Sequence, residues 1–92
     1  LQDEFSAEVE PDEIRPIAPG VSEIDASARV DEVNEALGIG LPEEEDYETL
    51  AGFVLSEFGR IPRPGDEFEH EGVRYEVTDA SDRRVLSIRV TT

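Results

Sequence analysis

The 92-residue sequence contains no cysteine, methionine, tryptophan or lysine, and it has a single histidine. Without cysteine, a disulfide framework, a thiol nucleophile and a cysteine zinc site are all excluded. No apolar run approaches the roughly 20 residues that a membrane-spanning helix needs, and no signal peptide is present. The missing initiator methionine leads us to expect a piece of a longer protein, and one that does not itself insert into a membrane.

What the chain has in abundance is negative charge. It carries 24 acidic residues against eight arginines, for a net charge of −16. This balance argues against nucleic-acid binding in a basic groove and disfavours docking on an anionic membrane surface. With 37% hydrophobic residues, the chain is nevertheless not a disordered acidic tail. The length fits one domain with one modest core.

The charge is unevenly distributed along the chain. Residues 1–48 hold 16 acidic residues and two arginines, whereas residues 49–92 hold eight acidic residues and six arginines. The second half is therefore expected to contribute more of a packed sheet. Residues 1–13 are acidic and lack a regular period, so we interpret them as an acidic linker from an upstream domain. Residues 14–92 are expected to form the folded domain.

Two short strands and two short helices are predicted in the first part of that domain. Pro19-Gly20 is a turn dipeptide between expected strands over 14–18 and 21–25, the first of them an edge strand because Pro16 cannot donate to a ladder. Ser27 is the expected cap of the first helix and Asp46 that of a second helix over 47–58. Glycines 38 and 59 are expected to end the two helices. Helical spacing selects the buried stripes, which are Val30, Val33 and Leu37, and then Leu50, Phe53, Val54 and Phe58.

The last part of the sequence reads as strands of period two. Phe68 and His70 precede a two-residue turn at Glu71-Gly72, and an alternating strand follows the turn. A further turn at residues 80–82 leads to a last strand that contains Leu86, Ile88 and Val90. Strands that are segregated from helices predict an α+β domain with a largely antiparallel sheet and two short helices.

Several of these segments together resemble a known family, the CorC/HlyC transporter-associated domain. The sequence VDEVNEALG looks like the family's first helix, and LPEEEDYETLAG is similar to its most recognisable motif. Three further stretches, GRIP, PGD and GVRYEV, follow in the expected order. The resemblance covers residues 22–89, and the LQDEF start resembles the exit from the paired CBS domains that precede this module in the family.

This resemblance implies a function, but the family brings no set of catalytic residues with it. Such domains lie at the cytoplasmic C-terminus of membrane proteins linked with magnesium and cobalt efflux, or named hemolysin-like, and are thought to modulate ion transport. The expected partners are the preceding CBS domains and the membrane domain of the same chain, with a homodimer as an alternative. The fold resembles part of the FAD-binding (PCMH-type) fold. Binding of an adenine or flavin nucleotide, such as FAD, is therefore the second function considered, although no cofactor is expected.

The densest acidic run is the candidate site for a divalent cation. Mg²⁺ and Ca²⁺ take carboxylate oxygens, which Glu43, Glu44, Glu45 and Asp46 could supply. The alternative is structural, because carboxylates just before a helix stabilise its positive end by about 0.3–1 kcal/mol each. The spacing does not match the calcium-loop pattern, and consecutive carboxylates need not converge on one point.

Arginines are the candidate contacts for an anion, a nucleotide or a partner protein. Arg60 and Arg63 flank Ile61-Pro62, and Arg74 follows in the hairpin. Guanidinium groups suit bidentate recognition of phosphate or carboxylate. In so acidic a chain, the alternative is that these arginines pair with the protein's own carboxylates.

Two other motifs are weaker. His70 is expected to be solvated beside its turn, since no nucleophile or orienting partner is evident in the sequence, and a pH-sensing role remains an alternative. Gly38-Ile39-Gly40 follows a helix and leads into Leu41-Pro42, whereas a dinucleotide fingerprint follows a strand and opens a helix. We therefore interpret these glycines as a helix end and connector.

Overall fold

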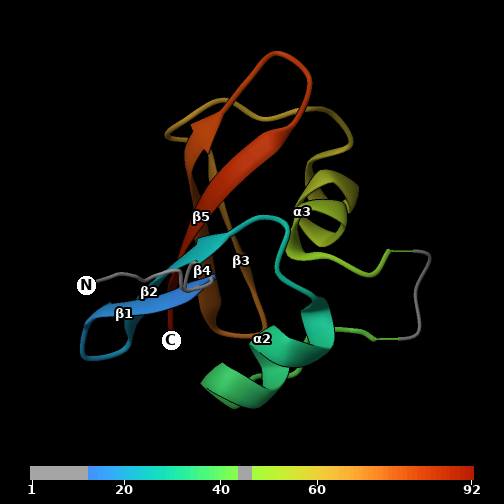
Figure 1. Ribbon diagram of the computed structural model, residues 1–92. Coiled ribbons are helices and arrows are strands. Elements are labelled where there is room, and N and C mark those ends of the chain that lie inside the picture. Colours follow the sequence, from blue (N-terminus) through green and yellow to red (C-terminus); the bar gives the residue numbers. More distant parts are fainter. Residues whose placement is uncertain (1–12, 44–46) are drawn as a thin grey trace, which may run out of the picture.

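The computed structural model describes residues 13–43 and 47–92, which form a five-stranded antiparallel sheet with helices on one face (Figure 1). The elements in chain order are β1 (Ile14–Ala18), β2 (Val21–Asp25), α2 (Val30–Leu37), α3 (Leu50–Phe58), β3 (Glu67–His70), β4 (Val73–Ala80) and β5 (Val85–Thr91). The strand order is β1-β2-β5-β4-β3, so the last strand lies in the middle of the sheet. The α+β class and the antiparallel sheet are as predicted. The sheet, however, draws its first hairpin from the acidic half of the chain.

The hydrophobic core lies between the sheet and the helices. Because side chains alternate across a strand, Ile24 on β2, Ile88 on β5 and Val77 on β4 come into one row on the same face. Helix α3 packs against β5 and against α2. Phe53 of α3 is buried at the centre, with ring centroids 5.2–5.8 Å from four other rings, which are Tyr47, Phe68, His70 and Tyr75. Both predicted helical stripes face this core.

Both helices end as the sequence predicts, but neither begins as expected. Gly38 and Gly59 follow the two helices with φ angles of 67° and 72°, the left-handed conformation that glycine adopts at no steric cost. Helix α3 begins at Leu50 rather than at residue 47, and the Thr49 hydroxyl accepts a hydrogen bond from Gly52 N at 3.3 Å. The predicted cap at Asp46 is therefore wrong.

The start of α2 also departs from prediction. The N-cap position is Arg29, which makes no side-chain cap bond, and the predicted cap Ser27 donates to Asp25 Oδ1 instead. The reason lies in a contact with the segment before α3. Val30 N donates to the Glu48 carbonyl at 2.9 Å, and Leu50 N donates to the Ala28 carbonyl at 2.8 Å. These backbone bonds satisfy helix-start N–H groups that a side chain would otherwise cap.

The β3–β4 hairpin has the predicted two-residue turn. Glu71 and Gly72 have φ angles of 52° and 83°, as a type I′ turn requires at both central positions. Glu71 is the non-glycine residue with positive φ in the described part of the chain. This turn sets the register in which Phe68 pairs with Tyr75, and the two rings stack with centroids 5.0 Å apart.

Candidate functional site

The sheet face opposite the helices is the most distinctive surface of the domain. In the described part of the chain, neither helix packs on it (Figure 1). The strand register places a row of charged side chains across it from edge to edge, in the order Arg15, Glu23, Arg89, Glu76 and Glu67. We call this surface the open face. An uncovered sheet face in a small domain is a candidate for contact with another protein or domain.

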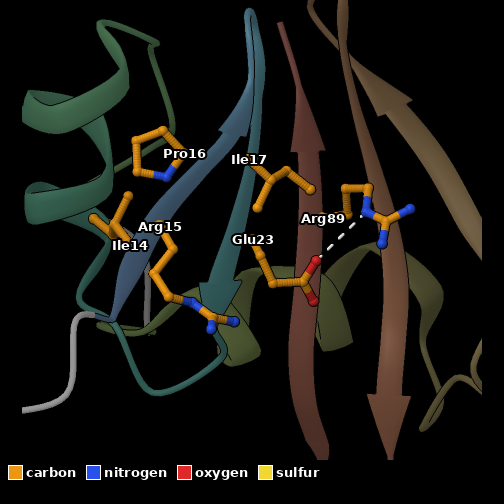
Figure 2. A pocket seen from close by; sticks show the side chains of 6 residues that line it. All are labelled: Ile14, Arg15, Pro16, Ile17, Glu23 and Arg89. Atoms are coloured by element: carbon orange, nitrogen blue, oxygen red, sulfur yellow. Dashed lines mark hydrogen bonds and ion pairs between the residues drawn. The ribbon is translucent and has the colours of Figure 1, made fainter.

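A groove of about 630 Å³ runs along β1, where the open face meets the edge of the sheet (Figure 2). Its lining combines apolar and charged side chains, namely Ile14, Arg15, Pro16, Ile17, Glu23 and Arg89. Ile17 is 52% exposed, which makes it the most exposed large hydrophobic residue of those described. In Figure 2, the Glu23 carboxylate lies between the Arg15 and Arg89 guanidinium groups. The groove therefore offers a partner an exposed apolar side chain next to charged groups held in fixed positions.

Glu23 organises the charged part of this groove. Its Oε2 accepts a hydrogen bond from Ser87 Oγ at 2.6 Å and another from Thr78 Oγ1, while Oε1 lies 3.4 Å from Arg89 Nε. Partial burial raises the pKa of Glu23, but the hydrogen bonds from Ser87, Thr78 and Arg89 outweigh it, so the pKa lies below its usual value. The carboxylate thus stays ionised and holds Arg89 against the sheet.

The edge strand that forms the groove's outer wall is poorly suited to strand addition. Asp25 N donates a hydrogen bond to the Glu13 carbonyl, so these two residues form a hydrogen-bonded pair between the strands. In an antiparallel ladder, residue pairs that are hydrogen-bonded alternate with pairs that are not. By this alternation, the backbone groups of Ile14 and Pro16 point away from β2, toward the open edge. Pro16 has no N–H to present there, which blunts the edge against pairing with another chain. Contact through the open face is therefore favoured over contact through this edge.

The predicted cation site is only partly described. Glu43 is exposed, and its Oε2 accepts a hydrogen bond from Asn34 Nδ2 at 2.7 Å. Glu44, Glu45 and Asp46 lie outside the described residues. Among residues 13–43 and 47–92, no group of three or more His, Asp or Glu side chains is placed to share a metal ion. Asn34 also exchanges two hydrogen bonds with the Leu41 backbone, so it fixes the connector after α2.

The three predicted arginines do not converge on one site. The Arg60 guanidinium lies 3.2 Å from Asp66 Oδ2 and over the ring of Phe58. Arg60, Arg63 and Asp66 line one pocket in the loop before β3. A backbone hydrogen bond from Arg63 lowers the pKa of Asp66, with help from Arg60. Arg74 lies on the open face, with its Nε 3.5 Å from Glu67. Arg60 and Arg74 thus pair with the protein's own carboxylates.

His70 is less solvated than the sequence suggests. Its side chain is one-quarter exposed and packs edge-on against Phe53, because the I′ turn directs it toward the core side of β3. The Nε2 atom is buried without a hydrogen-bond partner in the described part of the chain, 3.8 Å from Glu71 Oε2. Gly38 and Gly40 border the adjacent pocket of about 270 Å³. These glycines form a helix end and connector, as interpreted.

Sequence reasoning missed the groove residues Arg15, Ile17, Glu23 and Arg89. Alternation within each strand places charged residues on one face, and that signal is readable from the sequence. Which strands are neighbours is not readable, since Glu23 and Arg89 are 66 positions apart. The groove exists only because β2 pairs with both β1 and β5.

Comparisons with known proteins agree with this fold. A family model described as a transporter associated domain, CorC_HlyC, matches residues 15–92. The magnesium and cobalt efflux protein CorC of Vibrio cholerae is 31% identical over 91 residues, which are 99% of this chain and 31% of that protein. The corresponding protein of Escherichia coli K12 is 29% identical over 90 residues and is covered to 30%. The chain thus spans about a third of the length of these curated relatives.

Solved structures show the same architecture. The transporter associated domain CorC_HlyC from Nitrosomonas europaea superimposes with a TM-score of 0.80 at 26% identity, over 90% of this chain and 100% of that chain. The CorC_HlyC domain of a Xylella fastidiosa hemolysin has a TM-score of 0.77 at 32% identity, over 89% and 96%. That hemolysin domain has also been solved in complex with Mg²⁺ and Mn²⁺. In the part of our chain that is described, neither helix has the length and apolarity to cross a bilayer.

Proposed function

The chain belongs to the CorC_HlyC family of transporter-associated domains, and from this membership we propose that it is a non-catalytic regulatory and interaction module that modulates ion transport. The observation that carries the proposal is the family match over residues 15–92. Relatives named magnesium and cobalt efflux proteins point to a cation efflux or hemolysin-like membrane protein as the setting.

In this proposal the chain is one part of a longer protein. The curated relatives are about three times its length, which leaves room for a membrane domain and for the CBS pair that the family resemblance places before it. We place the module on the cytoplasmic side of the membrane. Its partners are the CBS domains and the membrane domain of the same chain, with a second copy as the alternative.

The open face supplies a physical means of regulation. A bound domain can bias a transporter only if it contacts one conformation of that transporter better than another. A groove with the exposed Ile17 and the oriented Glu23–Arg89 pair is a surface on which such a difference can be built.

Divalent cations enter the proposal as regulators rather than as cofactors. The related Xylella fastidiosa domain was solved with Mg²⁺ and Mn²⁺. In this chain the acidic run of Glu43, Glu44, Glu45 and Asp46 is the candidate for weak cation binding. Nucleotide binding, the second function considered, has no support in the contacts of the described residues. Of the three candidate arginines, Arg60, Arg63 and Arg74, the first and the third are engaged by Asp66 and Glu67, and Arg74 lies on a different face from the other two.

Deletion in the longer protein tests the proposal. Removing residues 14–92 should leave membrane insertion intact and change either the rate of Mg²⁺ or Co²⁺ efflux or its dependence on cation concentration. Efflux from cells loaded with each ion provides the measurement, and blotting of the membrane fraction controls for expression. Unchanged efflux together with unchanged assembly would contradict a regulatory role.

A further inference from the structure

The open face carries more negative than positive charge. The strand register places six acidic residues and three arginines on it, which are Glu23, Asp25, Glu67, Glu69, Glu76 and Asp79, with Arg15, Arg74 and Arg89. Two of the arginines are matched, since Arg89 pairs with Glu23 and Arg74 pairs with Glu67. The face therefore has a surplus of carboxylates that its own arginines do not neutralise.

The surplus lies on the β3–β4 half of the face. Glu69, Glu76 and Asp79 form no ion pair with another described residue. Glu69 and Glu76 lie opposite Arg74 and Arg89 in the strand register, but β3 and β4 together still place four carboxylates and one arginine on this face. Such an excess of like charge costs stability unless a partner supplies the opposite sign. The apolar groove at Ile17 lies on the other half of the same face, beside β1. The face thus combines an apolar foothold at one side with unmatched negative charge at the other.

We infer that the open face docks against lysine- and arginine-rich cytoplasmic loops of the membrane domain, with an apolar side chain of those loops seated over Ile17. The inference rests on the proposed function, since it takes the chain to be a cytoplasmic module. Short cytoplasmic loops of membrane proteins carry an excess of Lys and Arg, so they have the charge that this face lacks.

Charge also decides against two other occupants. The cytoplasmic leaflet carries a negative surface potential, which repels a module with a net charge of −16. A second copy of the chain has the same net charge and would place its own surplus against this one. The negative charge of the open face thus attracts basic protein loops, whereas the negative surface of the bilayer is repelled. Docking of this kind orients the module beneath the transporter, where it can distinguish between transporter conformations.

Because the attraction is between surface charges, it should weaken steeply with salt. The Debye length falls from about 10 Å at 0.1 M ionic strength to about 3 Å at 1 M. The test therefore uses the full-length protein in nanodiscs of neutral lipid, in a background free of other cysteines. Ile17→Cys reports on the open face, and Ser56→Cys, exposed on α3 in the other layer, is the matched reporter. The rate of maleimide labelling measures how much of the time each site is covered.

At low salt we expect Ile17→Cys to label about tenfold more slowly than Ser56→Cys, and the difference should close in about 1 M salt. Replacing the unmatched carboxylates, by Glu69→Gln, Glu76→Gln and Asp79→Asn, should raise Ile17→Cys labelling about fivefold. The control triple of Glu32→Gln, Glu35→Gln and Glu57→Gln removes the same charge from the helical layer and should leave the rate unchanged.

Four results would overturn the inference. Equal effects of the two triples would mean that only net charge matters, and labelling that is insensitive to both salt and the open-face triple would mean that charge does not hold the contact. Protection that appears only in anionic lipid would identify the bilayer as the occupant, and protection lost on dilution of the nanodiscs would identify a second copy. The deletion experiment stays separate, since altered efflux without protection of Ile17→Cys refutes the docking surface and leaves the regulatory role standing.

Discussion

Ser87 Oγ donates a hydrogen bond of 2.6 Å to Glu23 Oε2, joining two residues that are 64 positions apart. The bond crosses from β5 to β2, so it ties the first hairpin to the strand at the centre of the sheet. The same carboxylate accepts from Thr78 on β4. One side chain therefore links three strands on the face that the helices leave open.

The first prediction concerns this carboxylate. Glu23→Gln should lower the free energy of unfolding by about 1–2 kcal/mol at pH 7, because charge-assisted hydrogen bonds are stronger than neutral ones. The pKa of Glu23 in the folded protein lies below its ordinary value of 4.5. The contribution of this carboxylate to the free energy of unfolding is therefore fully present above pH 4.5 and is lost as the pH falls through the folded pKa. Urea unfolding of both proteins from pH 7 to pH 3 should show the two stabilities converging at acidic pH. A difference that does not shrink as the pH falls below 4.5 toward the folded pKa would contradict this assignment.

The second prediction concerns the centre of the core. Phe53 is 1% exposed and has four aromatic neighbours, so Phe53→Ala should cost about 3–5 kcal/mol. A loss this large approaches the whole stability of a small domain, so Phe53→Leu, with a smaller cavity, is the more informative variant. Ile17→Ala serves as control, since Ile17 is half exposed, and should change stability by less than about 0.5 kcal/mol. Urea titrations followed by circular dichroism provide the measurement.

The third prediction concerns the I′ turn. Glu71 has a positive φ that favours asparagine or glycine, so Glu71→Asn should raise the free energy of unfolding by about 0.5–1 kcal/mol. Gly72→Ala should lower it, because alanine is strained at a φ of 83°. Opposite shifts of the melting temperature in these two neighbours would establish the turn type. Shifts of the same sign would argue for a different hairpin conformation.

The fourth prediction concerns salt. The chain has a net charge of −16, and most of its described ion pairs join exposed groups that contribute little, the exception being Glu23–Arg89 with its partly buried carboxylate. Repulsion among carboxylates should therefore dominate, and screening should raise the melting temperature between low salt and about 1 M sodium chloride. Scanning calorimetry at constant pH measures the shift. A constant or falling melting temperature would mean that native ion pairs outweigh the repulsion.

Much of the local structure could be predicted from the sequence. Pro19-Gly20 and Glu71-Gly72 mark turns because their backbone preferences act within two residues, and Gly38 and Gly59 end their helices for the same reason. The starts of the helices could not be predicted in this way. Their first N–H groups are satisfied by backbone carbonyls from a segment about 20 residues away, so Ser27 and Asp46 were the wrong caps.

The candidate site, too, has some features that the sequence predicts and others that only the tertiary structure determines. The acidic excess, the missing cysteines and the alternation of polar and apolar residues are properties of the sequence alone, and with the family resemblance they determine the fold class and the kind of module. The groove and the open face were decided by tertiary structure. Period-two alternation directs Glu23 and Arg89 to a face of the sheet, but only the pairing of β2 with β5 makes them neighbours. Strand pairing joins residues that are distant in the chain, and the energy that selects it comes from the shared core rather than from local preference.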